Sequence, residues 1–229
     1  MLATVLGPSP VTLEEMRTFS RTVLTLFVAL IPACASQAEQ TPKSASPQRS
    51  VPAVDSGGIT NRVYRNTTFG FSYKIAYGWV DRTQEMAEDS NGDSTEAKKS
   101  IVLLAVFERP PAAAGDSINS AVVVAAEAAS SYPDLKNEGQ YFDLVSELAK
   151  SRELKVVNEP YDFPLGAMQL VRGDFSQPLG NLTLYQSTLV MMQKGYFVSF
   201  TFIGGSQEEM DGLIESLSFS RKESPTPHK

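Results

Sequence analysis

The sequence predicts an α+β fold in which helices cover a mainly antiparallel sheet. Residues 69–75 alternate aromatic or aliphatic side chains with small or polar ones, the period of a half-buried strand. Further apolar segments of strand length follow one another through short turns, whereas only two segments have the helical period. Strands that adjoin in this way, with few helices between them, indicate an antiparallel sheet in one domain.

Six later segments have the composition of strands. Residues 101–107 and 121–126 are continuous apolar runs, typical of central strands that are covered on both faces. The remaining predicted strands are 154–157, 167–173, 182–192 and 195–203. Gln193-Lys194-Gly195 predicts a hairpin turn between the last two strands. The polar segment 85–99 is predicted to be a solvated loop.

Two segments have the 3.6-residue period of an amphipathic helix. The apolar stripe of the first is predicted to be Tyr141, Leu144, Val145 and Leu148. The stripe of the second is predicted to be Met210, Leu213, Ile214 and Leu217. Ser206, with Glu209 three residues later, forms a capping-box signature and predicts where the second helix begins.

The N-terminal part has the character of an export signal. Residues 23–31 (VLTLFVALI) are too short to span a bilayer as a helix and suit the apolar region of a signal peptide. Arg17 and Arg21 precede this run and supply its basic region, with Met16 as an alternative start of translation. Residues 1–34 are therefore predicted to be a signal segment.

Cys34 is predicted to be a lipid attachment site. The segment Ile31-Pro32-Ala33-Cys34 resembles the lipobox of bacterial lipoproteins, although Pro32 departs from the usual residue at its position. A lipidated Cys34 would place the protein on the outer face of the cytoplasmic membrane or in the periplasm. The alternative is ordinary cleavage at the small-x-small site 33–35, which would give a secreted soluble protein.

The rest of the chain divides into three parts by composition. Residues 35–58 are rich in Ser, Pro, Gln and Ala and are predicted to form a disordered linker. Residues 59–221 are predicted to form a single globular domain. Residues 222–229 are predicted to be a disordered tail.

Composition also excludes several kinds of function. A net charge of −6 and a pI near 4.9 argue against a nucleic-acid partner and give no general attraction to anionic lipid. The one histidine, His228, lies in the predicted tail, and Cys34 is the one cysteine. Ser/His and Cys/His catalysis and zinc sites of the usual kind are therefore not expected. We predict no catalytic residue, no metal and no cofactor; the ligand-binding residues remain unassigned.

Two motifs resemble ligand-binding loops, but we interpret them as an ordinary loop and an ordinary turn. Asp89-Ser90-Asn91-Gly92-Asp93 places oxygen ligands at alternate positions, as calcium requires, but its glycine falls two places early for an EF-hand. Gly204-Gly205 precedes a helix, as in a phosphate-binding loop, yet Glu208 and Glu209 would repel an anion there. A solvated loop and a tight strand-to-helix turn are the preferred interpretations.

Two further patterns have competing interpretations. Trp79 is interpreted as a core residue, with a ligand-stacking surface formed with Tyr77 as the alternative. Asn66-Thr67-Thr68 and Asn181-Leu182-Thr183 match the glycosylation sequon, a match that means little in a bacterial cell.

Residues 69–79 (FGFSYKIAYGW) resemble the opening of PsbP-like domains, where a glycine-aromatic strand runs into Ile-Pro-x-x-Trp. Ala76 stands where that proline is usual. The order of elements is also similar, ending in a hairpin, a helix and a short strand at 217–219. The resemblance implies an α/β/α sandwich around an antiparallel sheet and a non-catalytic binding module. Members of the family are extrinsic subunits of photosystem II or assembly factors, and a relative in fold is the nuclear Ran-release factor.

These observations lead to one functional hypothesis with two alternatives. The chain is expected to be an exported, lipid-anchored binding or assembly module of the cell envelope. Its expected partners are the membrane, through the lipidated N-terminus, and another envelope protein. The alternatives are an enzyme that uses carboxylate or Lys chemistry and a purely structural envelope protein.

Overall fold

The computed structural model describes residues 54–92, 100–110, 113 and 115–219. The predicted signal segment, most of the predicted linker and the predicted tail lie outside the described residues, together with Cys34 and His228. Within the described part the chain forms two antiparallel sheets and three α-helices.

The larger sheet has seven strands in the order β4-β5-β6-β10-β9-β8-β7, and every neighbouring pair is antiparallel. Its strands are β4 (Val80–Asp81), β5 (Ser100–Phe107), β6 (Ala121–Ala128), β7 (Lys155–Leu165), β8 (Met168–Leu179), β9 (Leu182–Gln193) and β10 (Tyr196–Gly204). The predicted hairpin between β9 and β10 is present: Lys194 and Gly195 have φ of 51° and 80°, as a two-residue type I′ turn requires.

The smaller sheet has four strands in the order β1-β2-β3-β11. Its strands are β1 (Gly58–Thr60), β2 (Val63–Asn66), β3 (Phe71–Lys74) and β11 (Leu217–Phe219). The last strand pairs with β3, so the C-terminal end of the domain closes the sheet that its N-terminal end begins.

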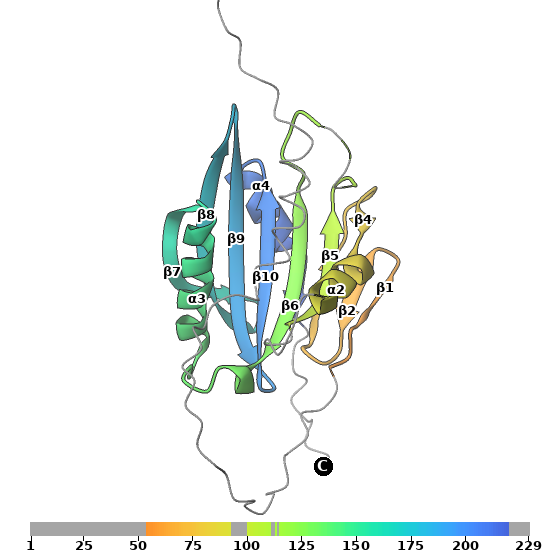
Figure 1. The fold of residues 1–229 in the computed structure, drawn as a ribbon. Helices are drawn as coiled ribbons and strands as arrows, with labels where there is room; N and C mark the ends of the chain where they lie inside the picture. Colours follow the sequence, from red (N-terminus) through yellow and green to blue (C-terminus); the bar gives the residue numbers. More distant parts are fainter. Residues whose placement is uncertain (1–53, 93–99, 111–112, 114, 220–229) are drawn as a thin grey trace, which may run out of the picture.

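The sheets and helices form three layers (Figure 1). Helices α2 (Thr83–Gly92) and α3 (Glu138–Ser151) cover one face of the larger sheet, and α4 (Gln207–Glu215) with the smaller sheet covers the other. A short 3-10 turn, η2 (Ala129–Ser131), leads from β6 towards α3. The predicted α+β class and central antiparallel sheet are confirmed. The structure adds that the third layer is partly a second sheet, which the strand predictions had not separated.

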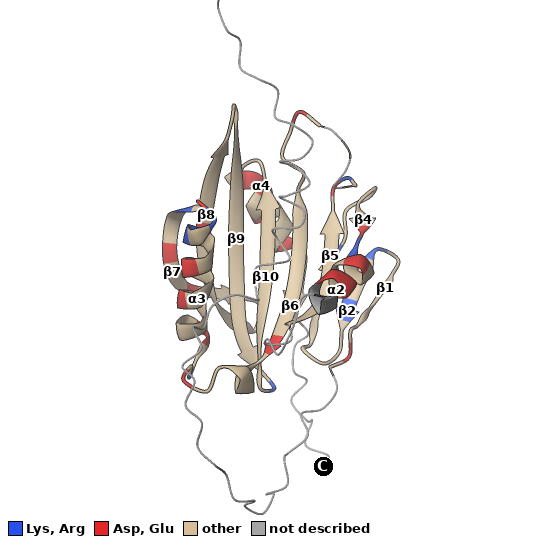
Figure 2. Cartoon of the chain, viewed as in Figure 1, with Lys and Arg blue, Asp and Glu red and all other residues tan. Residues whose placement is uncertain are grey.

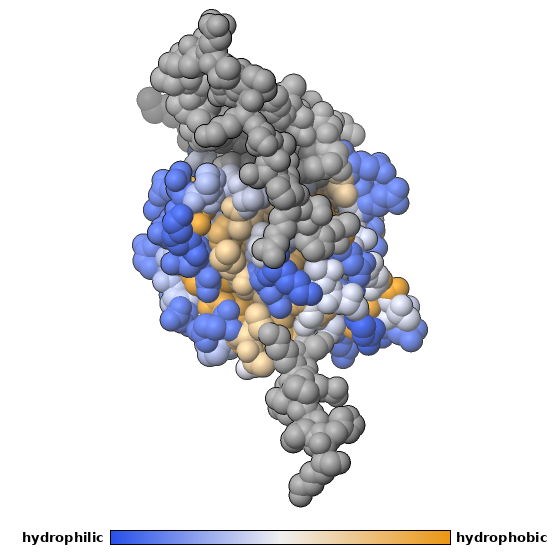
Figure 3. Space-filling model, turned by 90° about the horizontal axis from the view of Figure 1, so that it is seen from below, coloured by the Kyte–Doolittle hydropathy of each residue, from blue (hydrophilic) through white to orange (hydrophobic). Residues whose placement is uncertain are grey.

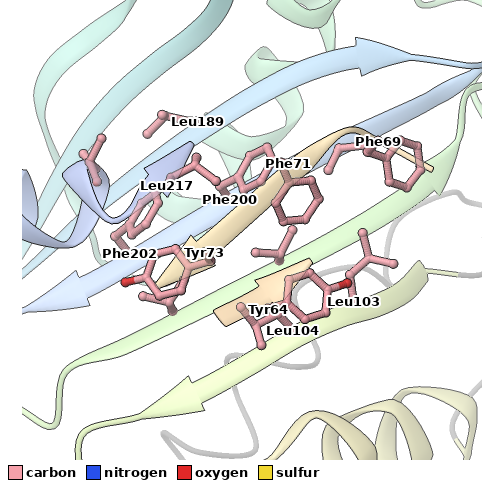
Figure 4. Close-up of a cluster of buried hydrophobic side chains, with 14 of the residues drawn as sticks. Tyr64, Phe69, Phe71, Tyr73, Leu103, Leu104, Leu189, Phe200, Phe202 and Leu217 are labelled. Carbon is pink, nitrogen blue, oxygen red and sulfur yellow. The ribbon is translucent and has the colours of Figure 1, made fainter. Parts of the chain in front are cut away.

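An aromatic core lies between the two sheets (Figure 4). Phe71 of β3 meets Phe200 of β10 edge to face, with ring centroids 5.0 Å apart. Tyr73 lies near Phe202 at 6.3 Å, and Phe69 packs on Tyr196 at 5.8 Å. The alternation in residues 69–75 thus buries its aromatic side against the larger sheet, as the sequence predicted.

A second core lies beneath α3. Tyr141 stacks on Phe197 of β10, with ring centroids 4.5 Å apart and an interplanar angle of 14°. Phe142 occupies the space above Gly173, where an added Cβ would lie 2.7 Å from its ring. The predicted stripe is therefore partly wrong: Phe142 and Ala149 face the sheet, whereas Leu144 is 45% exposed.

The prediction of a solvated loop at 85–99 is wrong for its first part. Residues 85–92 belong to α2, and 93–99 lie outside the described residues. The helix begins where the Asp81 carboxylate accepts from the Thr83 N–H (2.9 Å), and Met86 is buried against the large sheet. Because the apolar contact comes mainly from one side chain, the local sequence has little helical period.

The folded part includes residues 54–58, which the sequence analysis had placed in the linker. Val54 packs against the aromatic core. The side-chain amide of Asn66, 1% exposed, donates to the Asp55 carbonyl (2.9 Å) and to the Tyr64 hydroxyl (3.1 Å), while its oxygen accepts from the Phe69 N–H (2.9 Å). The sequon at Asn66 is therefore a buried structural contact.

Candidate functional site

Polar side chains from three strands meet on the face of the larger sheet that α4 covers. Asp174 of β8 is 7% exposed, and its carboxylate accepts three hydrogen bonds. The donors are Arg172 Nε (2.8 Å), Ser187 Oγ of β9 (2.6 Å) and Asn158 Nδ2 of β7 (2.9 Å). A buried carboxylate needs such donors because it has lost its water.

Arg172 extends this network to α4. Its Nη2 lies 3.4 Å from both Ser187 Oγ and Asp211 Oδ1, and its guanidinium lies 5.1 Å from the centre of the Phe163 ring. Burial, the largest single influence, lowers the pKa of Arg172, but the hydrogen bond and charge of Asp174, together with Tyr161 and Asp211, outweigh burial and raise it. The side chain therefore stays cationic and holds β7, β8, β9 and α4 together.

Tyr161 lies at the open edge of the network. It is 39% exposed and meets the Phe163 ring edge to face, with centroids 6.3 Å apart. Burial, followed by the charge of Asp174, raises the pKa of its hydroxyl. The hydroxyl is thus a neutral donor beside a carboxylate that is already occupied.

A second buried carboxylate, Glu127 of β6, lies beneath α3. Glu127 is 2% exposed and accepts a hydrogen bond from the Tyr132 hydroxyl. Burial first, and then the charge of Glu127, raise the pKa of Tyr132 and of Tyr141 well above the ordinary value. Both tyrosines therefore remain protonated, and the group joins β6, the segment after η2 and α3.

The Gly204-Gly205 turn is filled by a side chain of the protein. The Glu209 carboxylate accepts from the Gly205 N–H (2.8 Å) and from the Ser120 hydroxyl. The Ser206 hydroxyl accepts from the Glu209 N–H (3.1 Å), so the predicted N-cap of α4 is confirmed. An internal anion thus occupies the place that an external phosphate would need, in agreement with the predicted strand-to-helix turn.

The other predicted positions are scattered. Asp89 to Gly92 lie in α2 and Asp93 lies outside the described residues, and no group of metal-ligating side chains occurs among the residues that the structure describes. Trp79 is only partly buried against the aromatic core. Tyr77 is 89% exposed, with the Arg62 guanidinium 5.6 Å from its ring centre. Trp79 therefore packs against the core, whereas Tyr77 lies on the surface.

Neither buried carboxylate was among the predicted site residues, although each had a local signal. Asp174 follows Arg172 by two residues in a strand, a spacing that places both on one face of the sheet. Glu127 ends the apolar run of β6. Which partners they meet depends on strand pairing, which a single segment does not contain.

Exposed apolar side chains away from these networks occur on α3, on β7, on β9 and, at Ile59, on β1. Leu144 of α3 and Val157 of β7, which packs against that helix, are 45% and 40% exposed. Met192, 42% exposed, lies next to the β9–β10 turn. Seen from below, the molecule shows apolar surface between hydrophilic margins (Figure 3). No helix of the described residues is long and apolar enough to cross a membrane.

No family model matches the chain, and no curated protein matches it in sequence. Solved structures do match in shape. The solution structure of cyanobacterial PsbP from Synechocystis has a TM-score of 0.46 at 12% identity, covering 72% of this chain and 96% of that one. PsbP-like domains are also the family that the motif of residues 69–79 resembles.

Two further solved structures are similar at lower scores. LpqN, described as involved in cell envelope biogenesis of Mycobacterium tuberculosis, has a TM-score of 0.35 at 10% identity, with 66% of this chain and 83% of that chain covered. A Pseudomonas aeruginosa protein of unknown function, described as a putative regulator, has a TM-score of 0.34 at 14% identity. The match covers 59% of this chain and 89% of that chain.

Proposed function

We propose that the chain is an exported, lipid-anchored protein of the cell envelope whose domain binds or helps to assemble another envelope component without catalysing a reaction. The observation that carries the proposal is the order of the chain. The apolar run 23–31 lies just before Cys34, about twenty residues follow Cys34, and the next residues, 54–58, are fixed to the edge of the smaller sheet.

The anchor follows from acyl-chain physics. Each buried CH₂ contributes about 0.8 kcal/mol to membrane binding. Two acyl chains on Cys34 would therefore anchor the protein stably, whereas a single chain would bind only reversibly. If residues 35–53 behave as a flexible chain, the ends of a segment of this length lie about 25 Å apart on average. The domain would then stay close to the membrane surface and remain free to meet partners there.

The buried carboxylates favour binding over catalysis. A general base must have a lone pair within reach of its substrate. Asp174, Glu127 and Glu209 instead accept hydrogen bonds that join elements of the fold. Exposed apolar side chains such as Leu144 and Val157 are better suited to contact with a partner protein.

Cell fractionation tests the anchor. Wild-type protein is expected in the membrane fraction, and Cys34→Ser is expected in the soluble fraction because it has no thiol to acylate. Ser36→Ala, two residues away, is the matched control and should behave as wild type. Equal solubility of wild type and Cys34→Ser would contradict the anchor.

Photo-crosslinking in intact cells tests the binding role. A photoreactive side chain at Leu144 should give one reproducible adduct with an envelope protein. The control position is Glu215, which is exposed on α4, on the opposite face of the larger sheet. Identical adducts from both positions, or none from Leu144, would argue against a partner on this face.

A further inference from the structure

Charge is unevenly distributed over this acidic protein. The chain as a whole has a net charge of −6, yet residues 56–80 contain three cations, Arg62, Arg65 and Lys74, and no carboxylate. This segment includes the first three strands of the smaller sheet. Figure 2 shows Lys and Arg on the smaller sheet near β1 and β2, and Asp and Glu on α2 and α4.

Strand geometry places two of these cations on one surface. In β2 and β3 the aromatic residues Tyr64 and Tyr73 point to the core, so the alternate residues Arg65 and Lys74 point outward and are exposed. The register pairs Arg65 with Ser72, and Lys74 with Val63. Arg65 and Lys74 are therefore diagonal neighbours on the outer face of two short strands.

The third cation continues this surface to an exposed aromatic ring. Arg62, in the β1–β2 turn, adjoins Val63 and lies over Tyr77. Among the described residues, no carboxylate lies within ion-pair distance of Arg62, Arg65 or Lys74. The nearby carboxylate of Asp55 accepts from the Thr67 hydroxyl (3.0 Å), beyond the opposite end of β2. We call Arg62, Arg65, Lys74 and Tyr77 the basic face.

We propose that the basic face is the surface with which the domain contacts anionic lipid headgroups of the membrane. The proposal rests on the proposed function, because the anchor supplies the high local lipid concentration. Cations near an anionic surface are attracted by its potential, and tyrosine is enriched where an apolar ring meets headgroups. Three cations together give on the order of a hundredfold preference for this orientation.

The entry point of the chain favours lipid over an acidic protein segment as the occupant. Val54 and Asp55 are fixed beside β2, so a chain anchored at Cys34 reaches the domain at the smaller sheet. The acidic remainder of the domain is repelled by an anionic surface. Tether and charge therefore both turn the smaller sheet to the membrane. Helix α3, with its exposed Leu144, faces away from β1–β3 and is available to a partner.

Fluorescence of Trp79, the only tryptophan and two residues from Tyr77, tests this contact. Full-length Cys34→Ser protein is titrated with vesicles that contain lipids brominated near the headgroup. Quenching is expected with phosphatidylglycerol vesicles and not with phosphatidylcholine vesicles, and it should disappear at about 1 M salt, where the Debye length is ~3 Å. Because this readout needs no acyl chain, it is independent of the fractionation test of the anchor.

Charge reversal identifies the surface responsible. The double variant Arg65→Glu, Lys74→Glu should lose at least tenfold in apparent lipid affinity. Lys155→Glu, Lys194→Glu makes the same charge change at exposed positions elsewhere and should lose less than threefold. Equal losses in the two variants, or quenching that ignores lipid charge, would overturn the proposal. So would a Trp79 response to soluble polyglutamate without one to phosphatidylglycerol, which would indicate an acidic protein segment as the occupant.

Discussion

Removing the Asp174 carboxylate should destabilise the domain more than any loss of a surface charge. In Asp174→Ala the guanidinium of Arg172, whose side chain is 12% exposed, loses its 2.8 Å partner. What remains is the Ser187 hydroxyl and the Asp211 carboxylate, each 3.4 Å from Nη2, and the Asp211 side chain is 66% exposed. Ser187 and Asn158 each lose an acceptor as well. An uncompensated buried charge costs about 3–5 kcal/mol, a large share of a typical stability of about 5–15 kcal/mol.

Two further variants separate the charge from the packing. Asp211→Ala removes the exposed partner of the same guanidinium and should cost at most about 1 kcal/mol. The double variant Arg172→Met, Asp174→Leu removes both charges and restores apolar volume. It should cost much less than Asp174→Ala, because no unpaired charge is left in the protein.

Urea denaturation followed by Trp79 fluorescence measures these free energies of unfolding. The expected order of destabilisation is Asp174→Ala first, then the double variant, then Asp211→Ala. If Asp174→Ala cost no more than Asp211→Ala, the Asp174 site would be accessible to water and the network would not hold α4. That result would refute the reasoning.

Two other perturbations test the fold. Asn66→Ala removes two donated hydrogen bonds and one accepted hydrogen bond at a buried site. We expect the free energy of unfolding in urea to fall by about 2–3 kcal/mol. The control Asn181→Ala, at an exposed position, should cost less than about 0.5 kcal/mol. In alkali, burial raises the pKa of Tyr64 to about 12, above the unfolded value of 10.0. The folded state then holds this proton more tightly, so the contribution of Tyr64 to stability should be constant below pH 10 and fall between pH 10 and 12 by up to about 1.4 kcal/mol per pH unit. A smaller rise in tyrosinate absorbance near pH 10 in folded Tyr64→Phe than in folded wild type would contradict the burial of Tyr64.

The sequence predicts secondary structure best where the structure of a segment depends on that segment alone. β5 and β6 are covered on both faces, so their continuous apolar runs are enough to identify them. The N-cap of α4 is equally local, because Ser206 and Glu209 supply both sides of its hydrogen bond. α2 was missed because tertiary contacts stabilise it: the Ala105 N–H donates to the Thr83 hydroxyl, and Met86 packs on the sheet.

The sites were harder to predict than the strands. The Asp174 network requires β7, β8 and β9 to pair in register, and its residues span positions 158 to 211. The basic face had a visible signal, the absence of carboxylates between residues 56 and 80, but its meaning depends on which residues point outward. Partial burial of Trp79 likewise depends on packing against distant strands.

The intact mass of the mature protein, purified from membranes, tests the central claim most directly. We predict that residues 1–33 are absent and that the chain begins at Cys34 with the added mass of a diacylglycerol, with or without a third acyl chain. A thioether-linked modification should appear on Cys34 and be absent from Cys34→Ser. A mature chain that begins after residue 34, or that retains an unmodified Cys34, would contradict a lipid-anchored envelope protein.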